Sequence, residues 1–205
     1  VFIESNLSSI KSGNCLALII KATEGSINTW FDDTYCNFNS FNFPGWSDAD
    51  NKFTIGEIGG TGKQIVSVGA YVSGTSYTDL NSDTYNLTNQ TLKDLATFSS
   101  KGPTLDGRMK PEITAPGSLI ASSVSSYDAT EPSLRVKATT IDNKTYYYGV
   151  MAGTSMATPY VTGVLATWLQ ANPDLTPDEV KSILQKTSIN DEYTGTVLPN
   201  GNNTW

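Results

Sequence analysis

Histidine is absent from this chain of 205 residues, and cysteine is scarce. The two cysteines, Cys15 and Cys36, are too few for a disulfide scaffold or a closed zinc site, so they form either two buried thiols or one disulfide. We therefore expect no zinc or iron site. The lack of histidine also removes the side chain that most often accepts a proton from a reactive serine, so any such chemistry needs a base from elsewhere.

Basic side chains are outnumbered by acidic ones. The chain has 13 Lys and Arg against 20 Asp and Glu, which gives a formal net charge of -7. This charge argues against nucleic acid and anionic membrane surfaces as partners, because both need a basic face. No apolar run approaches the ~20 residues that span a bilayer. Residues 1–5 have neither a Met nor the pattern of a signal segment, so we expect the sequence to begin inside a longer protein.

Residues 1–60 favour β-structure. Apolar or alternating stretches predict short strands at 16–20, 27–31 and 38–43. Turn residues separate these stretches at 12–14, 24–25, 44–45 and 59–60. Closely spaced short strands are typical of a sandwich or jelly roll, so we expect this segment to belong to one.

The pattern changes near residue 61. Residues 63–71 predict a buried strand, and a polar loop is expected from 73 to about 94. Turn residues then alternate with short predicted strands at 112–114 and 119–121. Residues 134–150 predict a hairpin that turns at residues 142–143.

Two helices are predicted after residue 150. The first begins near Ser155, and its apolar residues recur on one face up to about 172, namely Val161, Val164, Leu165, Trp168 and Leu169. The second starts with a capping box, in which Thr176 is the N-cap, Pro177 takes the first helical position and Glu179 completes the box. Its inward-facing residues are expected to be Val180, Ile183 and Leu184.

The stretch 153–159 (GTSMATP) places a serine at the expected start of the first helix. There the unpaired N–H groups of the first turn can donate to an oxyanion, and the helix dipole favours negative charge. Gly153 lets the backbone turn without a Cβ in the way. We hypothesise that Pro159, which lacks an N–H, disturbs the first turn and holds Ser155 in a fixed pose. On this interpretation Ser155 is the candidate nucleophile.

The same spacing has simpler interpretations. Thr154 or Ser155 could serve only as the N-cap, which is the usual role of Ser and Thr at helix starts. A Ser–Lys dyad is a further alternative, and it requires Lys101 or Lys110 to be buried within hydrogen-bond reach of Ser155. Both lysines stand in polar stretches, where we expect exposed turns.

Several stretches together resemble the subtilisin-like serine peptidases (subtilases, the peptidase S8 family). Residues 153–159, with Val161 and Gly163, resemble the active-site serine motif of that family. Residues 65–71 resemble the family's core strand, and residues 98–104 with 106–117 resemble the signature stretch before the serine motif. Downstream, residues 172–180 resemble the start of the following helix. They occur in the family's order over residues 61–188.

The resemblance implies an α/β fold, an incomplete three-layer domain with a mostly parallel sheet and flanking helices. It also implies peptide-bond hydrolysis by an Asp-His-Ser triad. Ser155 would be the nucleophile and its backbone N–H one donor of the oxyanion hole, with motif support from Gly153, Thr154, Met156 and Pro159. The triad Asp and His and the oxyanion Asn come earlier in the family order than this segment, so none is assigned here. Asn14 is a candidate for the oxyanion Asn by residue type, but its flanks do not fit.

The resemblance also divides the chain. We expect residues 1–60 to be the end of a β-rich, jelly-roll-like insertion, of a kind that some bacterial subtilases carry. Residues 61–205 would be the C-terminal portion of the catalytic domain, inactive alone because the triad His and Asp are absent. An incomplete sheet has exposed edges, which favours a homo-oligomer through those edges or partial disorder in the 73–97 loop and the C-terminal tail.

Partners and location follow from the resemblance alone. The expected partners are a protein or peptide substrate and the missing N-terminal catalytic part. The expected location is extracellular or at the cell surface. No cofactor is evident, and although calcium is common in the family, no liganding loop can be placed. Two features depart from the family, namely Tyr160 where a His is usual and an end at Trp205 where a Gly-Tyr-Gly-like continuation is expected. The alternative functions are a catalytically dead relative and a β-sandwich binding or adhesion module.

Overall fold

The computed structural model describes residues 19, 21, 23–30, 38–50, 52–56, 60–127, 131–189 and 193. Contacts divide the chain into two units, Val1–Ser47 and Asp48–Trp205. In the first unit, residues 27–30 and 38–43 form no strand, so the predicted strands there are wrong over the part described. A strand gains little stability without an apolar layer that covers one of its faces. In this unit large apolar side chains stay exposed, among them Trp30, Phe41, Phe43 and Trp46.

Other predictions for the first unit have mixed outcomes. The turn at 44–45 is confirmed by the backbone, since the Trp46 N–H donates to the Phe43 carbonyl at 3.2 Å. The predicted strand at 16–20 lies outside the described residues except for Ile19, and both cysteines lie outside them too. The assignment of residues 1–60 to a jelly-roll-like insertion stays a prediction.

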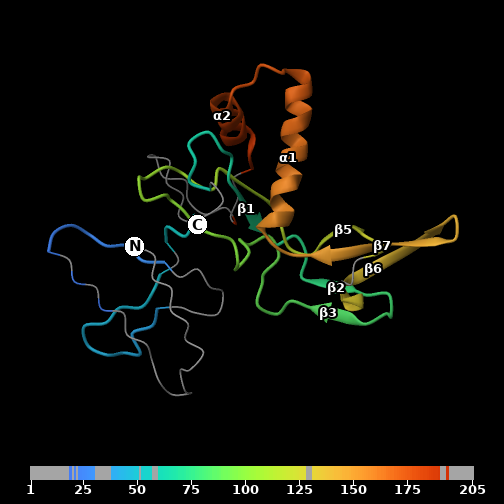
Figure 1. Cartoon of the computed structure of the whole chain (residues 1–205), viewed down its shortest axis with the longest axis horizontal. Coiled ribbons are helices and arrows are strands. Elements are labelled where there is room, and N and C mark those ends of the chain that lie inside the picture. Colours follow the sequence, from blue (N-terminus) through green and yellow to red (C-terminus); the bar gives the residue numbers. More distant parts are fainter. Residues whose placement is uncertain are drawn as a thin grey trace. The chain divides into compact units, whose positions relative to one another are not determined.

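A parallel pair of strands forms the centre of the second unit (Figure 1). Strand β1 (Val68–Tyr71) pairs with β4 (Ile113–Pro116), with Val68 opposite Ile113 and Tyr71 opposite Pro116. Helix α1 (Thr154–Ala171) packs on both strands. Small side chains at the contact let the helix approach the sheet closely, and the buried cluster there consists of Ala70, Val72, Ala96, Ala115, Ala157 and Val161. A helix packed on a parallel pair of strands is consistent with the α/β class, which is confirmed.

The strand predicted at 63–71 is shorter than expected, but its C-terminal half is present as β1. The strand predicted at 112–114 is β4, and the one at 119–121 is the start of β5 (Ile120–Val124). A one-turn 3-10 helix, Pro132–Leu134, precedes β6 (Arg135–Ile141), which forms an antiparallel sheet with β7 (Lys144–Met151) and β5 in the order β5-β7-β6. The predicted hairpin turn is confirmed, because Asp142 and Asn143 have φ of 50° and 61°, the left-handed values of a tight two-residue turn.

The polar stretch after β1 is not the irregular loop that its composition predicts. Strands β2 (Ser76–Thr78) and β3 (Thr84–Asn86) pair there as an antiparallel hairpin. The Asp79 side chain organises the turn, because its Oδ1 accepts the Asn81 and Asp83 N–H groups at 2.8 and 2.9 Å. The polar residues that indicate a loop in the sequence therefore provide the hydrogen bonds that close the hairpin.

Both helices form where the sequence places them. In α1, Val161 is buried and Leu165 packs against the core, but Val164 and Leu169 are 38% and 42% exposed. The prediction of a fully buried face is therefore wrong, because the two strands beneath α1 cannot cover the whole stripe. Helix α2 (Pro177–Thr187) has the predicted capping box, in which Thr176 and Glu179 satisfy each other's backbone N–H groups. Neither of these helices is long and apolar enough to cross a bilayer.

Candidate active site

Ser155 lies at the start of α1, close to the end of the strand that precedes it. Strand β7 ends at Met151, the chain turns at residues 152–153, and the helix begins at Thr154. Gly153 is the N-cap and has φ of 151° and ψ of 162°, a conformation that side chains with a Cβ rarely adopt. This conformation agrees with the expectation that Gly153 lets the backbone turn without a Cβ in the way.

The start of α1 is hydrogen-bonded to the ends of the two parallel strands. The Gly153 N–H donates to the Gly117 carbonyl at 2.8 Å, and the Gly117 N–H donates to the Tyr71 carbonyl at 3.1 Å. Tyr71 is the last residue of β1, and Gly117 directly follows β4. Ser155 is thus held at the carboxyl end of the parallel pair, the edge at which open α/β sheets place their ligands.

Neither Thr154 nor Ser155 caps the helix. Gly153 takes the N-cap position, no side chain makes the cap hydrogen bond, and Ser155 is the second helical residue. The interpretation of this motif as a simple N-cap is therefore wrong. The Ser155 residue is exposed, and its hydroxyl has no hydrogen-bond partner within the part of the chain that the structure describes. A serine hydroxyl with no structural role at a helix start is available for a reaction.

The backbone amide of Ser155 is available as well. Its neighbour Met156 donates its N–H to the Gly153 carbonyl at 3.0 Å. The Ser155 N–H lies in the first turn, whose N–H groups have no acceptor within the helix, and it has no acceptor among the described residues. This amide and the positive end of the helix dipole together fit one half of an oxyanion hole.

Pro159 does not disturb the first turn. Helix α1 runs unbroken through it, so the hypothesis that this proline distorts the start of the helix is wrong. The proline removes only the donor that would bond to the Ser155 carbonyl four residues earlier. One residue before it, the Thr158 hydroxyl donates to the Thr154 carbonyl at 2.9 Å and adds a bond across the same turn. Ser155 is therefore positioned by the hydrogen bond between Gly153 and Gly117 rather than by Pro159.

The two lysines considered as bases differ from their prediction. Lys110 is buried rather than exposed, and its Nζ lies 2.7 Å from a carboxylate oxygen of Glu112 and donates to the Ile65 carbonyl at 2.6 Å. Lys101 is half-buried, and its backbone N–H donates to the Thr54 hydroxyl at 2.8 Å. No lysine in the described ranges is hydrogen-bonded to Ser155, so the structure gives the Ser–Lys dyad no support.

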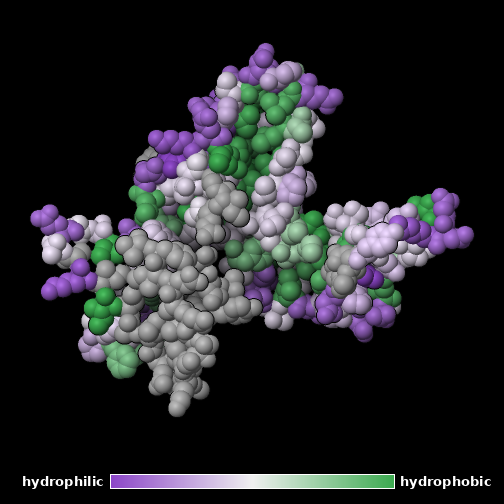
Figure 2. All heavy atoms as spheres, viewed as in Figure 1, coloured by the Kyte–Doolittle hydropathy of each residue, from purple (hydrophilic) through white to green (hydrophobic). Residues whose placement is uncertain are grey.

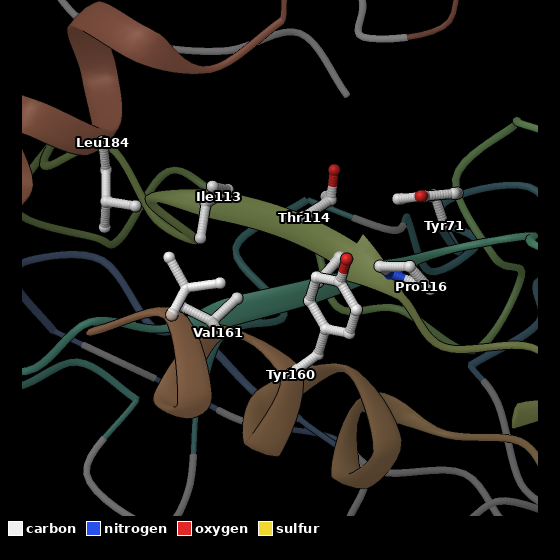
Figure 3. A pocket seen from close by; sticks show the side chains of 9 residues that line it. Tyr71, Ile113, Thr114, Pro116, Tyr160, Val161 and Leu184 are labelled. Atoms are coloured by element: carbon white, nitrogen blue, oxygen red, sulfur yellow. The ribbon is translucent and has the colours of Figure 1, made fainter. Parts of the chain in front are cut away.

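Tyr160, in the second turn of α1, borders an open apolar hollow of about 180 Å³ on the β4 side of the helix (Figure 3). Tyr71, Pro116 and Tyr160 lie at one end of the hollow, and residues from β4, α1 and α2 gather at the other, namely Ile113, Val161 and Leu184. Burial, and to a lesser degree the neighbouring Tyr160, raises the pKa of Tyr71. Hydrophobic residues also gather along the side of α1 that faces α2 (Figure 2).

Calcium is common in the family that the sequence resembles. Within the described ranges, no three Asp, Glu, Cys or His side chains are grouped so that they could hold a metal ion. The residues around Ser155 therefore do not fit a metal, and no step of the chemistry is assigned to one.

The sequence compares with a known family over most of its length. Residues 37–203 match the subtilase family. The chain belongs to that family. Among related subtilases, the serine protease AprX of Bacillus subtilis is 41% identical over 129 residues, which is 62% of this chain and 25% of AprX. The minor extracellular protease Vpr of the same organism is 35% identical over 98 residues, 47% of this chain and 10% of Vpr.

A plant subtilase is similar to the same degree. The subtilisin-like protease SBT4.10 of Arabidopsis thaliana is 38% identical over 102 residues, which is 49% of this chain and 14% of the plant protein. The chain therefore matches a quarter or less of the length of each of these three proteins. Ser155 lies at the start of a helix, where the sequence predicted it, and its role as the nucleophile stays a prediction. Gly117 positions the start of α1 and was not predicted to do so, although it lies in the stretch 106–117 that resembles the family.

Proposed function

We propose that this chain carries the nucleophile of a serine endopeptidase, and that Ser155 is that nucleophile. One observation carries the proposal. An exposed serine hydroxyl with no structural partner among the described residues lies beside an unbonded amide at the positive end of a helix. Membership of the subtilase family supports a peptide bond as the target.

The chemistry needs a base that this chain lacks. In the proposed reaction the Ser155 oxygen attacks the carbonyl carbon of a peptide bond while its proton passes to an imidazole supplied by sequence outside residues 1–205. The carbonyl oxygen becomes an oxyanion, which accepts one hydrogen bond from the Ser155 N–H and a second from a donor outside this chain. The C–N bond then breaks, the imidazolium returns its proton to the leaving amine, and water hydrolyses the acyl-enzyme. Alone, the chain is expected to be inactive. A site without its triad accelerates hydrolysis only about 10³–10⁴-fold over the reaction in water.

Several further features belong to the same proposal. The partners are a protein or peptide substrate and the N-terminal part of the catalytic domain, and residues 61–205 are the C-terminal portion of that domain. An extracellular or cell-surface location is supported by the similarity to Vpr, the minor extracellular protease of Bacillus subtilis. The outer edge of β4 is the open edge at which a homo-oligomer would form, since β4 pairs with β1 alone among the described strands. Calcium stays a prediction from family resemblance.

A fluorophosphonate probe tests the nucleophile. In the full-length protein, the probe should label Ser155, as mapped by peptide mass spectrometry, and labelling of the isolated chain should be at least a hundredfold slower. Ser155→Ala should abolish both labelling and peptide hydrolysis, whereas Ser122→Ala, which changes another exposed serine, in β5, should leave both intact. Equal labelling of the two proteins would contradict the need for an outside base, and a full-length protein that is never labelled would favour a catalytically dead relative.

A further inference from the structure

The β2–β3 hairpin is fastened to the turn that positions Ser155. The hairpin begins two residues after Gly74, whose carbonyl accepts the Ser118 hydroxyl at 3.1 Å. The Ser73 hydroxyl in turn donates to the Ser118 carbonyl at 2.7 Å, and Ser118 is fully buried. Because Ser118 directly follows Gly117, these bonds tie the base of the hairpin to the residue that holds the start of α1.

A second link joins the tip of the hairpin to the strands that lead to Ser155. The Leu80 N–H, in the turn of the hairpin, donates to the Arg135 carbonyl at 3.0 Å. Arg135 begins β6, and β6 pairs with β7, the strand that runs into Gly153. Figure 1 shows β2 and β3 beside β6, near the foot of α1. The hairpin is therefore fixed at its base and at its tip, on the side of the molecule where α1 begins.

Contacts within the hairpin hold its two strands and its turn together. The rings of Tyr77 and Tyr85 stack with their centroids 5.1 Å apart and an angle of 16° between their planes. Beneath the turn, Asp79 is buried and accepts two backbone N–H groups, and Tyr85 donates its hydroxyl to the other carboxylate oxygen at 3.5 Å. Burial, followed by the charges of Asp79 and Asp83, raises the pKa of Tyr85, so its hydroxyl stays neutral at physiological pH. A stacked aromatic pair held by such contacts is a preorganised surface for recognition.

We propose that the β2–β3 hairpin is part of the peptide-binding surface beside Ser155, and that Tyr85 and Asp83 there select a cationic substrate side chain. This inference rests on the proposed function. Tyr85 and Asp83 are both exposed, and an aromatic ring next to a carboxylate suits an ammonium or guanidinium group. The hairpin follows the carboxyl end of β1, and that end of the parallel pair is hydrogen-bonded through Gly117 to the turn before Ser155.

The test uses the full-length enzyme and quenched eight-residue peptides in which one position at a time carries lysine or its neutral isostere norleucine. Some lysine position should raise kcat/KM relative to norleucine. Tyr85→Ala and Asp83→Asn should each reduce that preference about tenfold, the size of one cation–π or charged contact, mainly through KM. Tyr85→Phe, which keeps the ring and its stacking, should retain the preference. Tyr127→Ala is the matched control, since this exposed tyrosine lies outside the hairpin.

The outcomes separate this inference from the proposed function. Peptide hydrolysis that survives Ser155→Ala would contradict the proposed function itself. Hydrolysis that depends on Ser155 but has no lysine preference, or one that Tyr85→Ala and Asp83→Asn leave unchanged, would overturn the inference about the hairpin alone. An equal loss of activity towards lysine and norleucine peptides would also overturn it, because that result indicates a structural effect rather than recognition.

Discussion

The amide of Gly153 donates a 2.8 Å hydrogen bond to the carbonyl of Gly117, which joins the start of α1 to the end of β4. Both residues need to be glycine for separate reasons. Gly153 has a backbone conformation that side chains avoid, and a Cβ on Gly117 would lie 2.4 Å from the Cβ of Ala70. The serine is therefore placed by close backbone contacts, which leave its side chain available.

Gly117→Ala should displace the start of α1 and slow the reaction of Ser155. The added methyl group cannot be accommodated without moving β1 or the 117–118 turn, and overpacking of this kind costs about 1–3 kcal/mol of stability. A shift of about 1 Å at the nucleophile costs on the order of a hundredfold in rate. We expect fluorophosphonate labelling of the full-length protein to slow by that factor, as measured by the rate of adduct formation.

Gly163→Ala is the matched control for this change. Gly163 lies in α1, and a Cβ there would meet no atom within 4 Å. The substitution should leave the labelling rate unchanged and raise helix stability by about 0.5–1 kcal/mol. If both alanine variants were labelled as fast as the original protein, the Gly117 contact would not position Ser155.

Glu112→Gln should destabilise the second unit strongly. The Glu112 and Lys110 side chains are 4% and 1% exposed, and the carboxylate also accepts the Ser67 N–H at 2.8 Å and lies 3.6 Å from the Lys181 ammonium. Removing one charge leaves Lys110 buried without its counter-ion, which costs about 3–5 kcal/mol. Chemical denaturation of the full-length protein should report that loss.

An exposed ion pair provides the comparison for Glu112. Asp106 and Arg108 lie 2.8 Å apart with side chains 55% and 32% exposed, so water screens them. Hydrogen bonds from Arg108 and Thr104 lower the Asp106 pKa to about 2, so the carboxylate is charged at neutral pH and the pair is present there. Asp106→Asn should therefore change stability much less than Glu112→Gln. Equal effects would mean that burial of the Lys110–Glu112 pair does not determine its contribution.

Thr176→Ala should weaken α2 without affecting Ser155. The Thr176 hydroxyl accepts the Glu179 N–H at 3.3 Å, and losing such a cap costs about 1 kcal/mol. Hydrogen bonds from Thr176 lower the Glu179 pKa, so the carboxylate is stabilised in the folded state and this contribution disappears as pH falls through that lowered pKa. Thermal unfolding should show a lower Tm for the variant at pH 7 and a smaller difference at pH 3. Thr176→Ser, which keeps the hydroxyl, should behave as the original protein.

The outcome of the sequence predictions depended on how local each interaction is. The capping box of α2 and the Asp142–Asn143 turn were predicted correctly, because both depend on residues that are neighbours in the sequence. The β2–β3 hairpin was missed, because its polar residues indicate a loop unless the turn-closing role of Asp79 is known. The burial of Lys110 was missed because it depends on a contact between distant parts of the chain. Its ammonium donates to the carbonyl of Ile65, which is 45 residues away in the sequence.

The sequence by itself determined the family, the candidate nucleophile and the need for an outside base, because these depend on which residues occur in which order. The tertiary structure alone decided that Ser155 neither caps the helix nor depends on Pro159. It also decided that Gly117 supports the helix start and that the hairpin after β1 reaches the same turn. Those facts arise from hydrogen bonds and close contacts between segments far apart in the chain, and such contacts exist only once β1, β4 and α1 have packed together.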